Sequence, residues 1–96
     1  MLPVVWSETA DQDLAVITDF IGRRNFVAGE RLWSKVRESV VHLPEHPHFY
    51  ATSERMPGCR EIVVHPNYLV IYEVGLHDVK VLRVLHARQE FPKYSH

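Results

Sequence analysis

The stretch VKVLRVL at residues 79–85 decides the fold, because it is the most strand-like segment of the chain. Valine and leucine fill it apart from two basic residues, a composition typical of a β-strand. Strict alternation along a strand predicts one face with Val79, Val81, Arg83 and Leu85 and another with Lys80, Leu82, Val84 and His86. Both faces are mostly apolar, which predicts a strand in the middle of a sheet.

Two further strands are expected directly before this one, at residues 61–64 and 68–74, where β-branched and aromatic side chains dominate. Short connectors of turn-forming composition separate the strands: HPN at residues 65–67 and GLHD at residues 75–78. Such connectors join neighbouring antiparallel strands. The C-terminal half is therefore predicted to form a three-stranded antiparallel meander.

A short strand and two helices are expected in the N-terminal half. Residues 2–6 are apolar, with a proline that fits only a strand start or an edge. Ser7 could cap the first helix, or Thr9 could do so in a capping box with Gln12. Ala10, Leu14, Ile17 and Ile21 form a helical apolar stripe, and Gly22 is expected to end the helix. Asn25 is expected to cap a second helix with Leu32, Val36 and Val40 on one face, antiparallel to the first.

The predicted fold class is α+β: an N-terminal strand, an antiparallel helix pair, then the meander (β-α-α-β-β-β), with the helices packed on the sheet. A chain of 96 residues can form one hydrophobic core but not two, so residues 1–96 are expected to be a single domain. Between the second helix and the meander lies a long loop with prolines at positions 44, 47 and 57. Long ordered loops are often functional.

Composition and motifs exclude several classes of function. The net charge of −1 predicts no overall attraction to nucleic acid or to an anionic membrane. No signal peptide or membrane span is expected, which indicates a cytoplasmic protein. Nucleotide-binding, nucleophile-elbow and zincin motifs are missing from the sequence, so no cofactor is expected. His42, His46 and His48 lie close together, but Pro44 interrupts their helical spacing and no metal site is expected. The single cysteine, Cys59, is expected to be at least half-buried and unreactive.

Basic and imidazole side chains gather in the C-terminal half, which makes them the candidate site residues: Arg55, Arg60, His65, Arg83, His86 and Arg88. Arg83 lies within an apolar strand and therefore needs solvent or a carboxylate, for which Glu61 and Glu73 are the candidates. His86 lies where the last strand leaves the sheet. There it could act as a general acid or base, or it could be a structural histidine.

Three segments in register resemble a known family. They are residues 56–64 (MPGCREIVV), 67–74 (NYLVIYEV) and 79–89 (VKVLRVLHARQ). They are similar to the C-terminal half of RelE/ParE toxins, and the expected element order extends the resemblance over nearly the whole chain. The resemblance implies a growth-arresting toxin of a type II toxin–antitoxin (plasmid stabilisation) module. It also implies a hetero-oligomeric complex with a cognate antitoxin protein.

Members of this family have two kinds of target: ParE-like toxins poison DNA gyrase, and RelE-like toxins cut messenger RNA at the ribosome. RelE-like toxins resemble one another in a middle strand that reads Asp-Tyr-Arg, where this chain has Asn67-Tyr68-Leu69. Because the phosphate-binding arginine is replaced by Leu69, gyrase inhibition without catalysis is favoured.

Two alternatives stay open. The first is a ribosome-dependent endoribonuclease in which His86 and His65 are catalytic and the arginines at positions 55, 60, 83 and 88 hold phosphate. Such an enzyme must activate a 2′-hydroxyl and protonate the leaving oxygen. The second is an interaction domain that is not toxic.

Overall fold

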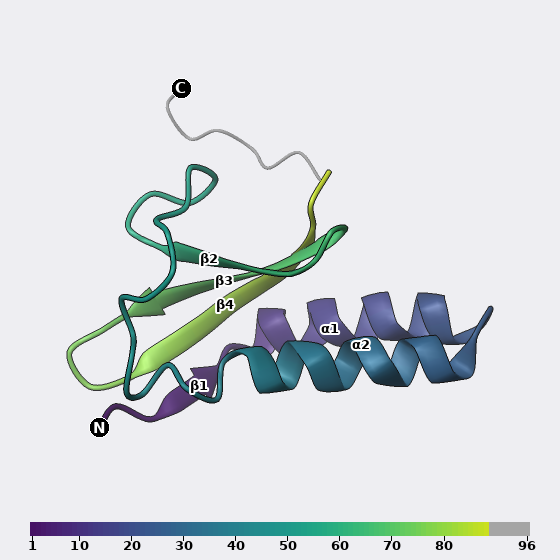
Figure 1. Ribbon diagram of the computed structural model, residues 1–96, viewed down its shortest axis with the longest axis horizontal. Helices are drawn as coiled ribbons and strands as arrows, with labels where there is room; N and C mark the ends of the chain where they lie inside the picture. Colours follow the sequence, from purple (N-terminus) through teal and green to yellow (C-terminus); the bar gives the residue numbers. More distant parts are fainter. Residues whose placement is uncertain (89–96) are drawn as a thin grey trace.

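The computed structural model describes residues 1–88 and confirms the predicted order of elements. The elements are β1 (Val4–Trp6), α1 (Glu8–Gly22), α2 (Phe26–Ser39), β2 (Arg60–His65), β3 (Tyr68–Val74) and β4 (Val79–His86). The first strand begins two residues later than predicted, and the last strand extends to His86. The fold is α+β, with two helices side by side along one face of the sheet (Figure 1).

The four strands form one mixed sheet with the order β1-β4-β3-β2. The predicted meander is present, since β3 pairs antiparallel with both β2 and β4. Composition did not indicate where the N-terminal strand pairs. In the structure β1 runs parallel to β4, with Val4 opposite Val79. This pairing confirms that β4 has a neighbour on each side and is a central strand.

Both helices begin at capping side chains. The Ser7 hydroxyl accepts a hydrogen bond from the Ala10 amide at 3.0 Å, and the Asn25 side chain accepts one from the Ala28 amide at 3.0 Å. Ser7 therefore caps α1, and the capping box expected from Thr9 and Gln12 does not form. The Ser7 hydroxyl also donates to the Leu82 carbonyl at 3.0 Å, which fixes the start of α1 against β4.

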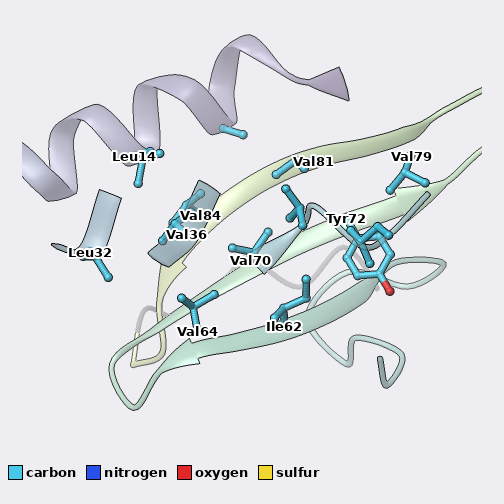
Figure 2. Close-up of a cluster of buried hydrophobic side chains, with 13 residues drawn as sticks. Leu14, Leu32, Val36, Ile62, Val64, Val70, Tyr72, Val79, Val81 and Val84 are labelled. Carbon is cyan, nitrogen blue, oxygen red and sulfur yellow. The ribbon is translucent and has the colours of Figure 1, made fainter. Parts of the chain in front are cut away.

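The main core lies between the helix pair and the sheet (Figure 2). The predicted stripe of α1 and the apolar face of α2 pack there against alternate residues of the strands. The members labelled in Figure 2 are Leu14, Leu32, Val36, Ile62, Val64, Val70, Tyr72, Val79, Val81 and Val84. Burial of this set from water supplies the main driving force for folding.

A smaller cluster covers the other face of the sheet. Cys59, Leu69, Ile71 and Leu85 are buried there, with Met56, Leu82 and Ala87 packed against them. Met56 and Cys59 come from the segment before β2, which is joined to β2 by a bridge between Thr52 and Arg60. Burial and the nearby charge of Glu73 raise the pKa of the Cys59 thiol, which favours the unreactive protonated form.

A bulge in β4 makes the expected strict alternation wrong in its second half. Ile71 pairs with Arg83 and Tyr72 with Val81, so Leu82 is an extra residue between two paired positions. An extra residue reverses the facing of the residues that follow it. As a result Val84 joins Val79 and Val81 in the main core, and Leu85 is in the smaller cluster.

The two helices approach closely at Gly29. A Cβ atom built there would lie 2.8 Å from the Thr18 carbonyl oxygen, whereas one at Gly22 would have no atom within 4 Å. We expect Gly29→Ala to lower the free energy of unfolding by about 1–2 kcal/mol, because overpacking outweighs the gain in helix propensity. The matched variant Gly22→Ala should be neutral or slightly stabilising. Urea unfolding of both variants measures this, and equal stabilities would contradict the close contact.

None of the helices within residues 1–88 has the length and apolar character needed to cross a lipid bilayer.

Candidate functional site

Three aromatic rings meet where β2 and β4 end and β3 begins. His65 is paired with Tyr68 across the β2–β3 hairpin, and Tyr68 is paired with His86 on β4. The ring centroids of His65 and Tyr68 are 5.9 Å apart, and those of Tyr68 and His86 are 5.2 Å apart with the rings edge to face. The two histidines therefore flank one tyrosine, and we call the three residues the sheet-end row.

Both histidines of the sheet-end row accept a hydrogen bond from the backbone. The Asn67 amide donates to Nδ1 of His65 at 3.1 Å, and the Arg88 amide donates to Nδ1 of His86 at 3.1 Å. A nitrogen that accepts an N–H bond carries no proton, so these contacts correspond to the tautomer with hydrogen on Nε2. In that tautomer each ring offers a donor rather than a lone pair to a ligand.

Arg88 follows the sheet-end row and is exposed. Within residues 1–88 its guanidinium makes no hydrogen bond or ion pair, so among the four predicted arginines it is the one best placed to meet a partner. The resemblance drawn from the sequence extends to Gln89, which lies outside the described residues.

Arg83 is held by a carboxylate, but by a different one from those expected. Its Nε and Nη2 atoms donate to the two oxygens of Asp13 on α1, at 2.7 and 3.2 Å. The Val84 amide donates to the same carboxylate at 3.0 Å. The expected partners Glu61 and Glu73 were therefore wrong, because the bulge and the position of α1 bring Asp13 to Arg83.

Arg60 joins the long loop to the sheet. Its Nη1 atom donates to the Tyr50 carbonyl at 2.6 Å and lies 3.5 Å from the His48 carbonyl. Close by, the buried Tyr72 hydroxyl donates to the Pro47 carbonyl at 2.7 Å. Both contacts order the loop, so Arg60 has a structural role in this conformation.

Arg55 also has partners within the fold. Its Nη1 atom lies 3.2 Å from both carboxylate oxygens of Glu61, and its Nη2 atom donates to the Ala87 carbonyl at 2.8 Å. The Glu61 carboxylate also accepts from the Ser53 hydroxyl at 2.6 Å. Arg55 thus connects the loop, β2 and the end of β4.

The loop histidines do not form a ligand set. His42 Nε2 lies 2.9 Å from the Tyr50 hydroxyl, and its ring packs against those of Phe49 and Tyr50. Among residues 1–88 there is no group of three or more histidine, cysteine or acidic side chains placed to hold a metal ion.

Sequence reasoning found the two histidines of the row but missed Tyr68, Ser53 and Asp13. The two-residue turn after His65 was a usable signal for Tyr68, because it places that residue opposite His65. Asp13 lies three residues after Ala10 and four before Ile17, so it borders the apolar stripe of α1. Nothing in the sequence distinguishes Ser53 from other polar residues of the long loop. In the structure it is buried, with 7% of its surface exposed.

Comparison with known proteins gives consistent matches over nearly the whole chain. Residues 4–91 match the family model described as the ParE toxin of the type II toxin–antitoxin system parDE. The chain is 32% identical over 87 residues to Toxin RelE2 of Caulobacter vibrioides, a match that covers 91% of this chain and 97% of the relative.

Solved structures show the same fold. A chain of the chromosomal ParDE toxin–antitoxin system from P. aeruginosa has a TM-score of 0.79 at 18% identity, covering 90% of this chain and 96% of that one. A chain of the E. coli DinJ-YafQ complex has a TM-score of 0.60 at 14% identity, covering 90% and 93%. At these identities the similarity concerns the fold alone.

Proposed function

Because the chain belongs to the ParE toxin family of type II toxin–antitoxin systems, we propose that it arrests growth by binding DNA gyrase, without catalysis of its own. It is the toxin of such a system, and its partner is a protein antitoxin that neutralises it. We place both proteins in the cytoplasm, where the proposed target acts.

The hydrogen bonding of the candidate histidines and arginines is the observation that carries this proposal. An endoribonuclease needs a base with a free lone pair to take the 2′-hydroxyl proton. In His65 and His86 the Nδ1 lone pair accepts a backbone amide instead. Three of the four predicted phosphate ligands, Arg55, Arg60 and Arg83, are bound to groups of the fold.

The middle strand supports the same conclusion. Leu69 replaces the arginine of RelE-like toxins, and its side chain is 3% exposed in the smaller cluster. An arginine at this position would either bury its charge in that cluster, which is costly, or have to leave the cluster to reach a phosphate. The sheet-end row with Arg88 is therefore proposed as a protein-binding surface.

The test is supercoiling of relaxed plasmid by gyrase with the purified, antitoxin-free chain. We expect stoichiometric inhibition, and we expect Arg88→Ala to weaken it roughly tenfold, as loss of one charged contact at an interface does. Arg31→Ala on the exposed side of α2 removes the same charge elsewhere and should inhibit like the wild type. Full supercoiling at an excess of the wild-type chain would overturn the proposal.

A ribosome-dependent endoribonuclease is the second candidate, favoured by the two histidines on either side of Tyr68 and by the similarity to a protein named RelE2. It requires both rings to change their hydrogen bonding when substrate binds. In a translating extract this function predicts discrete messenger cleavages that His86→Ala abolishes, and intact messenger would exclude it. Normal growth of cells that express the chain alone would leave two explanations, a non-toxic interaction domain or an inactivated toxin.

A further inference from the structure

The residue between His86 and Arg88 is held at both of its backbone polar groups. The Ala87 amide donates to the Asn67 carbonyl at 2.6 Å, and the Ala87 carbonyl accepts from Nη2 of Arg55 at 2.8 Å. Since β4 ends at His86, Ala87 and Arg88 lie beyond the last paired strand position among the described residues. Up to residue 88, the direction of the chain is therefore set by these two contacts, by the bond from the Arg88 amide to His86 and by the packing of Ala87 against the smaller cluster.

Arg55 is itself held in place by a partly buried network. Its side chain is 32% exposed, and that of its ion-pair partner Glu61 is 17% exposed. Ser53, which donates to Glu61, also accepts the backbone amides of Arg55 and Met56 at 3.1 and 3.0 Å. A carboxylate and a backbone carbonyl thus fix two arms of one planar guanidinium, so the group has little freedom to turn toward a ligand.

We propose that Arg55 is a positioning residue that fixes Ala87 and so orients His86 and Arg88 toward the target. The sequence had suggested Arg55 as a ligand-binding group, and its contacts support this different role. The inference rests on the proposed function insofar as Arg88 is taken to touch gyrase. The fixing of Ala87 can be measured without the target.

Arginine is required for this role because two different acceptors must be reached from one side chain in fixed directions. The guanidinium presents donors in a planar fork, whereas the lysine ammonium is a single point charge on a flexible stem. Arg55→Lys keeps the charge beside Glu61 but cannot hold both acceptors in this geometry. Lysine should therefore restore little of the positioning.

The experiment uses the full purified chain, free of antitoxin, with the variants Arg55→Gln and Arg55→Lys and with Arg31→Gln as the charge-matched control. Hydrogen exchange of the Ala87 amide and the ¹⁵N shifts of the His86 ring are measured by NMR. Both Arg55 variants should speed Ala87 exchange by roughly tenfold or more, as expected for a local opening. They should also move the His86 shifts, whereas Arg31→Gln should do neither.

Gyrase inhibition by the same samples connects positioning to function. We expect Arg55→Gln to raise the concentration for half-inhibition by roughly tenfold. Wild-type exchange and His86 shifts in both Arg55 variants would overturn the proposal even if inhibition fell, because Arg55 would then be touching the target itself. If the wild type fails to inhibit gyrase, the proposed function fails, and the exchange and shift data still decide whether Arg55 positions Ala87. Should Arg55→Gln not fold, Arg55→Lys gives the same comparison.

Discussion

Replacing Asp13 with alanine is expected to lower the free energy of unfolding by about 2–3 kcal/mol, because the carboxylate holds three donors from β4. Two come from the Arg83 guanidinium and one from the Val84 amide. The Asp13 and Arg83 side chains are 17% and 27% exposed, so water replaces these contacts only in part. The ion pair also joins α1 to the strand that leads into the sheet-end row.

A second aspartate on the same helix provides the control. Asp19 pairs with Arg23 at 3.0 Å, but the two side chains are 64% and 77% exposed. Pairs of that kind stabilise a helix by about 0.3–0.5 kcal/mol, so Asp19→Ala should change the free energy of unfolding very little. Urea unfolding of both variants, with Arg83→Met and the double variant Asp13→Ala/Arg83→Met, gives the coupling energy. Equal losses for Asp13→Ala and Asp19→Ala would contradict the role of burial.

The fold could be predicted largely from local patterns in the sequence. The apolar stripe of α1, the capping residue Asn25 and the hairpin composition of residues 65–67 each depend on near neighbours, and the structure confirms them. The bulge at Leu82 could not be predicted in this way. It depends on how β4 fits between β1 and β3 in three dimensions, and it changes which residues face the helices.

The arginines show why the site was harder to predict than the fold. Sequence gives the type of each residue, but whether a guanidinium binds a ligand or the fold depends on acceptors far along the chain. Asp13 and Arg83 are 70 residues apart, and Arg55 reaches a carbonyl 32 residues away. The same limit applies to His65 and His86, whose tautomers follow from turn amides that only the folded backbone places.

Tyr72 joins the sheet to the long loop, and its replacement should have the largest effect on stability. The residue is fully buried, its ring packs edge to face against Tyr50 with centroids 6.4 Å apart, and its hydroxyl donates to the Pro47 carbonyl. Tyr72→Ala is expected to lower the free energy of unfolding by about 3–5 kcal/mol through loss of burial and a cavity. Tyr72→Phe should cost about 1 kcal/mol, because it leaves only the Pro47 carbonyl unpaired.

The pH dependence of the free energy of unfolding distinguishes the contribution of the Tyr72 hydroxyl from that of its ring. Burial raises the pKa of Tyr72 above its ordinary value of 10.0, although the positive charge of Arg60 partly opposes this. Above about pH 10 the unfolded chain therefore loses the Tyr72 proton before the folded chain does, and unfolding becomes more favourable. The stabilisation is complete below that pH and is lost as the pH rises through the folded-state pKa.

Measured against the wild type, Tyr72→Phe should thus be the less stable protein near neutral pH, and the difference should shrink or reverse toward about pH 11. Chemical unfolding at both pH values gives the comparison. The buried thiol of Cys59 also titrates in alkaline solution, but it is present in both proteins and cancels in the difference. A stability difference that stays constant between the two pH values would show that the Tyr72 hydroxyl ionises as readily in the folded chain as in the unfolded one.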